Sequence, residues 1–552
     1  MMSIENADRL VPMMFRAQIV DRCQLQRIPN PRENRESDIL PWAREWTQEV
    51  YPELPITHGK VREEKYQINW RMISNSGVDD AIIRPVIGAR GWPYYPGSGM
   101  KGVFRRACTK DQSDRYCGEK KSKNDYEPGI LRFHGGYPID ASWQEGLVDI
   151  AHPQQSKQVG VEGRGSAFAM ISLYQPTIRF GISSSIDLEP AEWEDIWKIW
   201  DRAIQKGIGG RISAGYGQTN TRSETPPIYR CQLKGQGQAA KLLNGTGEFR
   251  PNIFRAALRG HALRIFGGLT DAISAQQLVG DLFGSIDRGG SEGLLSLNFI
   301  EREVILGTFA EGRRYEQPTY AATGEVNWHV TRELEQDRRL ALKKLVTGLT
   351  HFSMIFGGFG KSWRRADHRL FFEDYYEDGN KPLIGCHWQW ADDLTLQRDA
   401  SWHLWKLNQI PVRIDKLREI ALNWMQLQGL EPKAHTSWRE SWHPDSVQVW
   451  GRIADRADDS IAILWLHDCY SNRQSIKYTL AGQMNQVGRI WHRMYPIISL
   501  ERNEANPKKP IVRKRIQFIE LFTIFPNSDI PECEPFINFL QSQDDFIKLW
   551  GN

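Results

Sequence analysis

The sequence predicts an α+β protein that carries two tandem modules and a Trp-rich region towards its C-terminal end. Two observations lead to this prediction. Stretches with the period of a β-strand alternate with amphipathic helices, and one order of sequence features occurs twice along the chain. With 552 residues, the chain is long enough for roughly two to four domains, each with its own core.

The first expected elements are a strand, a short helix and a second strand. Met13–Leu25 is apolar enough for a strand, and Trp42–Val50 has the length of a short helix. Tyr66–Ile73 alternates between two sets of side chains, one of them apolar, which is typical of a half-buried strand.

A loop and a helix are expected next, in the segment G-W-P-Y-Y-P-G-S-G-M-K-G-V-F-R-R from Gly91 to Arg106. Its prolines fix φ and its glycines permit tight turns, so the loop is predicted to be ordered. Ser98 lies where the N-cap of a helix is expected. Lys101 and Arg105 then share a helix face suited to contact with phosphates. A different, apolar face consists of Met100, Val103, Phe104 and Ala107.

The first module continues with a charged, turn-rich stretch, Lys110–Pro128, which we interpret as a flexible insertion. Pro190–Lys206 is predicted to be an amphipathic helix, because its proline suits the first turn and its Trp and Ile residues form one stripe. It runs into the glycine-rich loop G-I-G-G-R-I-S-A-G-Y-G, from Gly207 to Gly217. Arg222–Pro227 is the predicted linker between the modules.

The second module repeats this order. A strand is expected at Ile228–Leu233, and a helix with Arg255 and Arg259 follows in the run F-R-A-A-L-R-G-H-A-L-R. A further helix, Arg332–Leu349, leads to a second glycine loop, G-G-F-G-K-S-W-R-R, which begins at Gly357. The offsets between the copies are similar, 259 − 105 = 154 for the helix and 361 − 211 = 150 for the basic residue after the glycines. This spacing predicts two modules of one plan.

Beyond the second module, Ile410–Gln428 is predicted to be a helix and Arg515–Phe525 a strand. The chain holds 21 Trp, and many lie between Trp388 and Trp491, where core or subunit-interface packing is the expected role. The predicted divisions are residues 1–224 for the first module, 225–387 for the second, 388–510 for a Trp-rich insertion or subdomain, and 511–552 for a strand and tail that complete the second module.

Composition excludes several classes of protein. The net charge is only +4, so contact with nucleic acid would depend on local patches rather than on a global basic field. The seven Cys include no C-x-x-C pair, which indicates a reduced chain without a disulfide framework or a structural zinc site of that type. No apolar run is long enough to span a bilayer and no signal-peptide pattern is present, so a cytoplasmic protein is expected.

The two conspicuous motifs resemble those of a known family. Gly91–Arg106 is similar to the P-G-S-S-x-K-G-x-x-R signature of the RAMP superfamily, with Gly99 in place of the second Ser, and Gly207–Gly217 is similar to its glycine-rich signature. These proteins build type III CRISPR effector complexes. The resemblance implies ferredoxin-like (RRM-like) modules, which agree with the alternation of strands and helices. The implied partners are a guide CRISPR RNA, a complementary target RNA, other RAMP subunits, and the large and small subunits of the complex.

The resemblance also implies a catalytic carboxylate. In RAMP subunits that cleave RNA, an Asp lies in a loop upstream of the P-G-S helix, and Asp79 in N-S-G-V-D-D-A-I-I-R-P matches it, with Asp80 as the alternative. Asp79 is also the one candidate ligand for Mg²⁺ or Mn²⁺, the cofactor that cleavage would use. The competing interpretation is an Asp that only stabilises a turn. Between Tyr229 and Phe254 the second module has Glu248 as its only acid, so no equivalent site is expected there.

The residues predicted to contact RNA fall into two sets. The set of the first module is Ser98, Lys101, Arg105, Arg106, Gly209, Gly210, Arg211 and Tyr216. The set of the second module is Arg255, Arg259, Gly358, Gly360, Lys361, Arg364 and Arg365. For Tyr216, stacking on a base and packing in the core are both open.

Three functions are consistent with these motifs. The leading one is a guide-RNA-binding backbone subunit of an antiviral defence complex, with two RAMP modules fused in one chain. This subunit would cleave target RNA at the first module as a metal-dependent endoribonuclease. The second is a non-catalytic RNA-binding scaffold. The third is an endonuclease that processes guide RNA, for which His58 is the only candidate base.

Overall fold

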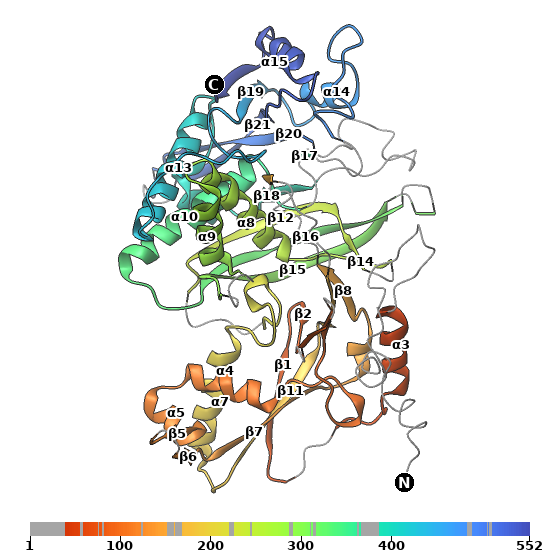
Figure 1. Ribbon diagram of the computed structural model, residues 1–552, viewed down its shortest axis with the longest axis vertical. Coiled ribbons are helices and arrows are strands. Elements are labelled where there is room, and N and C mark those ends of the chain that lie inside the picture. Colours follow the sequence, from red (N-terminus) through yellow and green to blue (C-terminus); the bar gives the residue numbers. More distant parts are fainter. Residues whose placement is uncertain are drawn as a thin grey trace. The chain divides into compact units, whose positions relative to one another are not determined.

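The protein is a mixed α/β structure with several small sheets (Figure 1). The computed structural model describes residues 39–55, 59–74, 77–79, 82–122, 125–151, 159–160, 168–219, 226–242, 245–285, 291–309, 311–312, 316–360, 364–365, 386–482, 488–504, 506 and 510–552. The chain divides into two compact units. Unit 1 comprises residues 1–153, 166–226 and 241–246, and unit 2 comprises residues 154–165, 227–240 and 247–552. Among the described residues, no helix is both long and apolar enough to cross a membrane.

The described part of unit 1 starts with the short helix that the sequence predicts and continues with helices and short strands. Its main elements are α3 (Ile39–Glu49), β1 (Arg62–Gln67), β2 (Arg71–Met72), β3 (Gly77–Asp79), β4 (Ile82–Arg84), η1 (Ala89–Gly91), α4 (Gly97–Ala107), α5 (Lys110–Cys117), β5 (Gly118–Lys120), β6 (Tyr126–Pro128), β7 (Leu131–Pro138), η2 (Ala141–Gln144), β8 (Val148–Ala151), β9 (Phe168–Ile171), β10 (Leu173–Tyr174), β11 (Thr177–Ser184), α7 (Pro190–Ile204) and η3 (Ile212–Ala214). The strand expected at Met13–Leu25 lies outside the described residues.

The main sheet of unit 1 is antiparallel, with the strand order β1-β11-β7. Along the chain the order is β1, α4, β7, β11 and α7, and an antiparallel bridge between Ile68 and Thr219 lies just beyond β1. Helices α4 and α7 pack on each other and cover this sheet, with Trp200 of α7 5.0 Å from Phe180 of β11 between ring centroids. Of the apolar stripe predicted for α7, Trp193, Ile196, Trp200, Ala203 and Ile204 are buried, and Trp197 is partly buried against the same core.

The strand predicted at Tyr66–Ile73 is broken into β1 and β2, and β2 pairs with β10 instead of β11. Arg71, which the alternating pattern places on the face opposite the apolar side chains, is fully buried. Its guanidinium donates to the Gly146 carbonyl at 2.8 Å and to the Ser172 hydroxyl at 2.9 Å. These bonds tie β2 to the segments around Gly146 and Ser172.

The prediction of a flexible insertion at Lys110–Pro128 is wrong for most of that stretch. It forms α5 and the β5–β6 hairpin, with residues 123–124 outside the described part. Thr109 and Gln112 make a capping box that starts α5, because each side chain accepts a backbone N–H of the other residue. Exposed polar side chains on a short helix give the same sequence signal as a loop.

Unit 2 contains the larger set of elements. They are β12 (Tyr229–Gln238), α8 (Asn252–Gly267), α9 (Ala272–Phe283), β15 (Leu295–Phe309), β16 (Gln317–Val330), α10 (Gln336–Ile355), β17 (Arg364–Arg365), β18 (His387–Trp390), α12 (Asp393–Arg398), η6 (Ala400–Trp402), α13 (Gln409–Leu427), β19 (Gln448–Ala454), α14 (Ala462–His467), β20 (Ile490–Glu501), β21 (Ile511–Ile524), α15 (Cys533–Gln541) and β22 (Ile547–Trp550). Strands β13 (Ala240–Lys241) and β14 (Gly247–Glu248) form a two-stranded sheet.

The first sheet of unit 2 has the strand order β15-β16-β12-β18, with every neighbouring pair antiparallel. Along the chain the order is β12, α8, α9, β15, β16, α10 and β18. The strand β18, rather than the C-terminal strand, fills the place beside β12. Helix α10 starts four residues later than the predicted Arg332 and continues to Ile355.

The second sheet of unit 2 has the order β17-β20-β21-β19-β22. Apart from β17, its chain order is β19, α14, β20, β21, α15 and β22, so the same arrangement of strands and helices occurs again (Figure 1, blue). The strand predicted at Arg515–Phe525 is β21 of this sheet. Residues 388–510, predicted as an insertion or subdomain, therefore contribute to both sheets.

Most Trp residues of this region are core residues, which is one of the two expected roles, while Trp405 is 46% exposed. Trp388, Trp424 and Trp442 are buried in one apolar cluster that also contains α8 and α10 residues. Trp442 stacks on Trp491 with 5.5 Å between ring centroids. Helix α13, predicted within one residue of its observed ends, packs against α10 and buries Trp424 in this cluster.

Candidate nucleic-acid interface

The signature segment of unit 1 forms a tight loop followed by α4. Pro96 is the N-cap and the helix starts at Gly97, so Ser98 is an exposed residue of the first turn and not the N-cap that the sequence predicts. A Cβ on Gly97 would lie 2.1 Å from the Phe133 carbonyl oxygen, which is why this loop needs a glycine there. Met100 and Phe104 are fully buried, and they fix the orientation of the helix.

The three cations of α4 differ in their surroundings. The Arg105 guanidinium donates to the Ser113 hydroxyl at 3.0 Å and to the Gly118 carbonyl at 2.8 Å, so part of its hydrogen-bonding capacity holds α5 and β5 in place. Lys101 is half-buried and Arg106 is exposed. Lys101 and Arg106 are therefore the better candidates for contact with a phosphate.

The glycine-rich loop after α7 folds back on the segment that starts at β2. The Gly210 N–H group donates to the Ile73 carbonyl at 2.8 Å, and the Gly217 N–H group donates to the Arg71 carbonyl at 2.6 Å. Arg211, with φ of 58°, adopts the left-handed conformation within the loop. The loop is thus more than the end of a helix, because it is tied to the chain that leads to Asp79.

Tyr95 joins the two signature motifs. It directly precedes Pro96, is buried, and its hydroxyl group receives a hydrogen bond from the backbone of Gly209. Burial raises the pKa of Tyr95, while the Gly209 bond and the nearby Arg106 charge act in the opposite direction. The structure therefore brings the start of α4, Arg106 and the glycine loop to one place, with Tyr95 as a positioning residue that the sequence analysis missed.

Tyr216 belongs to the core, so the prediction that it stacks on a base is wrong for the structure as it stands. Its side chain is 1% exposed, its ring lies 4.5 Å from that of Trp70, and its hydroxyl group donates to Asp149 at 2.6 Å. This is the alternative that the sequence left open. The buried Tyr216–Asp149 pair stabilises the base of the glycine loop.

Gly209 gives a test of the junction, by which we mean the contact between the segment that begins α4 and the glycine loop after α7. Its φ is +81°, and an added Cβ would lie 2.2 Å from the Ile73 carbonyl oxygen. We expect Gly209→Ala to destabilise unit 1 by about 1–3 kcal/mol because of backbone strain, measured as faster hydrogen exchange in β1, β7 and β11. Gly102→Ala is the matched control, since a Cβ there meets no atom within 4 Å and alanine favours the helix. Equal exchange in the two variants would contradict the strain argument.

The segment that carries the catalytic candidate is a β-hairpin. β3 pairs with β4, so that Asp79 is opposite Ile82, and β4 runs parallel to β9. Asp79 is the last residue of β3, while Asp80 and the side chain of Asp79 lie outside the described part of the chain. The backbone thus places Asp79 at the end of a hairpin, four residues after Asn75 and six after Ile73.

Unit 2 repeats the junction with different residues. His261 of α8 lies against the glycine turn after α10, with its Nε2 atom 3.5 Å from the Gly358 carbonyl oxygen. Arg255 donates to the Phe283 carbonyl at the end of α9, and Arg259 is half-buried. Gly360 has φ of +94° and packs against Cys386. Lys361 and the side chains of Arg364 and Arg365 in β17 lie outside the described residues.

An additional cationic surface lies on β21, and the sequence analysis did not include it. Arg513, Lys514 and Arg515 are exposed, and with neighbouring side chains they line a surface hollow of about 390 Å³. Arg513 and Arg515 both face Glu501 across the β20–β21 ladder, at 3.2 and 4.0 Å. The run R-K-R within this strand could have identified this surface, but the Trp-rich composition of the region drew attention to core packing instead.

Among the described residues, neither His134 nor the buried Ser460, His492 and Glu520 group has the geometry of a reaction centre. His58 and His152 lie outside the described residues, and His134 is 2.7 Å from the Ser183 hydroxyl. Ser460, His492 and Glu520 are buried together, but Nε2 of His492 faces both the Ser460 hydroxyl (3.2 Å) and the Glu520 carboxylate (3.1 Å). A Ser/His/acid triad needs the acid on the opposite ring nitrogen from the Ser, so this group is structural.

Comparisons with known proteins give partial likenesses. No family model matches the chain, and no curated protein matches it. A solved structure described as the type III-B Cmr-beta complex bound to cognate target RNA contains a chain to which this one is similar, with a TM-score of 0.23 and 17% identity over 30% of this chain and 58% of that chain. A chain of a type IV-B CRISPR complex is similar with a TM-score of 0.19 and 18% identity, over 30% of this chain and 94% of that chain.

Proposed function

We propose that this chain is a guide-RNA-binding subunit of a CRISPR effector complex, built from RAMP-type modules. The observation that carries the proposal is the junction found in both units. In unit 1 the start of α4 meets the glycine turn after α7 through Tyr95, and in unit 2 α8 meets the glycine turn after α10 through His261. The two motifs that resemble RAMP signatures are far apart in sequence, and a shared RNA-binding surface is a physical reason for them to meet.

The strand order supports ferredoxin-like modules. A βαββαβ module has its first strand between the fourth and third, with all neighbours antiparallel. The sheet β15-β16-β12-β18 has this order, and β1-β11-β7 has it for three strands, with the Ile68–Thr219 bridge at the fourth place. A surface of this kind, with cations and turn N–H groups at one end, suits the sugar–phosphate backbone of a single strand.

Target cleavage at the first module is the second part of the proposal. Asp79, at the turn of the β3–β4 hairpin, would accept the proton of the ribose 2′-hydroxyl. The 2′-oxygen would then attack the adjacent phosphorus as the 5′-oxygen leaves. A divalent cation, Mg²⁺ or Mn²⁺, held in part by Asp79, would supply charge stabilisation. Glu248, the one acid of the corresponding stretch of unit 2, is buried beside Arg250 and has a structural environment, so unit 2 would bind RNA without cutting it.

Binding to RNA tests the first part of the proposal. We expect Lys101→Gln and Arg106→Gln each to weaken binding of the full-length chain to labelled single-stranded RNA. Each variant should also reduce the slope of log binding constant against log salt concentration by about one. Fluorescence anisotropy over a series of salt concentrations measures both quantities. Lys198→Gln is the matched control, because Lys198 is an exposed cation of α7 paired with Asp195 in the same unit. Equal loss in the control, or no binding by the wild type, would contradict the proposal.

A further inference from the structure

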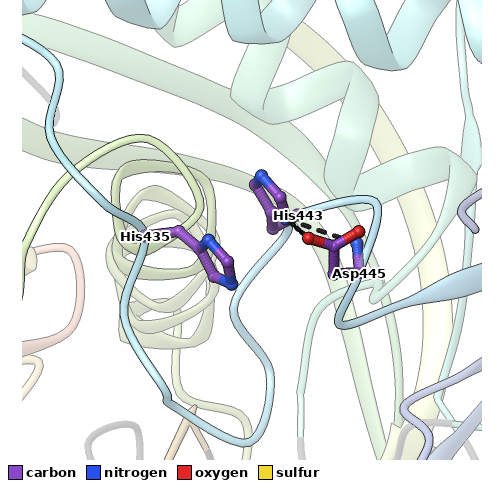
Figure 2. Close-up of side chains that lie close together, drawn as sticks. All are labelled: His435, His443 and Asp445. Atoms are coloured by element: carbon purple, nitrogen blue, oxygen red, sulfur yellow. Dashed lines mark hydrogen bonds and ion pairs between the residues drawn. The ribbon is translucent and has the colours of Figure 1, made fainter.

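The loop between α13 and β19 gathers three side chains with the chemistry of metal ligands. His435, His443 and Asp445 each offer one ligand atom, and these atoms lie within 4.8 Å of one another (Figure 2). Nδ1 of His443 is 3.4 Å from a carboxylate oxygen of Asp445. Two imidazoles and one carboxylate form a donor set that divalent transition metals prefer, and that differs from the all-oxygen set preferred by Mg²⁺.

The backbone around the three residues is fixed by hydrogen bonds. The Thr436 N–H group donates to the Gly267 carbonyl at 2.8 Å, next to His435. The Ser446 and Val447 N–H groups both donate to the His443 carbonyl, at 2.8 and 3.1 Å, and Trp442 beside it is fully buried. The loop therefore presents the three side chains from an ordered backbone.

The Asp445 carboxylate has a partner that orients it. Its second oxygen accepts a hydrogen bond from the Asn552 side-chain amide, and the Asn552 N–H group donates to the Pro444 carbonyl at 2.8 Å. Metal-binding carboxylates commonly have such a partner, because it fixes their orientation. An ion at this position would be connected to Asn552 through Asp445.

None of the three side chains is buried, although Nδ1 of His443 also accepts a hydrogen bond from the Asp445 N–H group at 3.3 Å. The His443 side chain is 25% exposed and that of Asp445 is 57% exposed. The two imidazole rings are stacked, with 3.7 Å between centroids and 5° between planes, so one ring must turn for both lone pairs to point at one ion. Arg418, a cation whose charge acts on His443, donates to the Trp442 carbonyl and so has a partner of its own.

We propose that His435, His443 and Asp445 bind one divalent transition-metal ion of the zinc class, with water in the remaining position. Three protein ligands and an open position are sufficient for a tetrahedral Zn²⁺ site. The ion would fix the α13–β19 loop against Asn552. This site is separate from the cation of RNA cleavage and does not depend on the proposed function.

The test is a Zn²⁺ titration of the full-length, tag-free chain after chelator treatment, with a chromogenic chelator as competitor. We expect one tightly bound Zn²⁺ per chain, and a loss of affinity of at least about tenfold in each of His435→Ala, His443→Ala and Asp445→Asn. Asp445→Asn keeps a carbonyl acceptor for Asn552, so it removes the charge with little effect on the fold.

His134→Ala and Asp458→Asn are the matched controls, because they remove the same side-chain types elsewhere and should bind Zn²⁺ as the wild type does. Replacement of Zn²⁺ by Co²⁺ supplies a second readout, the visible absorption of tetrahedral Co²⁺, which the three ligand variants should lose. Zn²⁺ binding that is equal in ligand variants and controls, or an octahedral Co²⁺ spectrum in the wild type, would overturn the proposal.

Discussion

Replacement of Asp79 by alanine is expected to remove one cut from the target RNA while binding of guide and target is retained. The reason is positional, since Asp79 is the last residue of β3 and the chain that leads to it is tied to the glycine loop through Ile73. A carboxylate that assists proton transfer contributes about 10²–10⁴-fold to the rate. We therefore expect at least about a 100-fold slower cut, measured with the guide-loaded complex in the presence of Mg²⁺.

Two variants make this result specific. Asp80→Ala tests the neighbouring carboxylate, and Asp187→Ala is the control, since Asp187 is almost fully exposed and pairs only with the equally exposed Lys60 among the described residues. An unchanged pattern of cuts in Asp79→Ala would return Asp79 to a turn role. The non-catalytic scaffold would then be the better function for this chain.

The second large effect is expected in the buried ion cluster of the second sheet of unit 2. Glu520 accepts hydrogen bonds from Arg452 at 2.6 Å and from the Ala462 N–H group at 3.0 Å, and Ser460 also donates to it. Replacement by Gln keeps the shape but leaves the buried Arg452 with Asp459 as its acidic partner. Loss of one partner of a buried pair costs about 3–5 kcal/mol. We expect Glu520→Gln to lower hydrogen-exchange protection throughout β19, β20 and β21.

Unit 1 serves as the internal control for this experiment, because protection in β1, β7 and β11 should remain at the wild-type level. The double variant Arg452→Met, Glu520→Gln should be less destabilised than the sum of the single variants, since the two side chains contact each other directly and their shared interaction is lost only once. Additive effects would show that the two side chains act independently.

The same cluster should make this sheet sensitive to acid. Burial by itself raises the pKa of Glu520, but the hydrogen bond with His492, the Ser460 hydroxyl and the Arg452 charge lower it below its usual range overall. A lowered pKa in the folded state means that the stabilisation is complete above the unfolded pKa of about 4.3 and is lost as the pH falls below it. Exchange in β19–β21 should therefore rise below about pH 4 in the wild type, and this rise should be absent in Glu520→Gln.

The helices were the most predictable part of this fold. The stripe of α7 and the length of α13 could be read from the sequence, because each helix buries one face on a core and its period of 3.6 residues survives. The five-stranded sheet could not be predicted in the same way. β19 is buried on both faces along most of its length, so it has no alternation, and its partner β21 begins more than 50 residues later.

The candidate site was predictable in part. Sequence motifs identified Lys101, Arg106 and Gly209, because local glycine and charge patterns survive without knowledge of the fold. Tyr95 was missed because its role depends on a contact with Gly209, which lies more than 100 residues away in sequence. Tyr216 was included among the RNA-contacting candidates but is buried, because the sequence alone does not distinguish an exposed aromatic residue from a buried one.

The division of the chain has a consequence for its synthesis. Residues 154–165 lie within the sequence of unit 1 but belong to unit 2, where Val159 is fully buried in the core and its carbonyl accepts a hydrogen bond from the Glu440 N–H group at 3.0 Å. Unit 1 in turn includes residues 241–246, which follow the start of unit 2. A ribosome therefore releases part of each unit before the other is complete, and a fragment that begins at Pro227 lacks a side chain from its own core. Unit 1 is not complete until residues 241–246 have been synthesised. Unit 2 combines residues 154–165 with residues synthesised after unit 1.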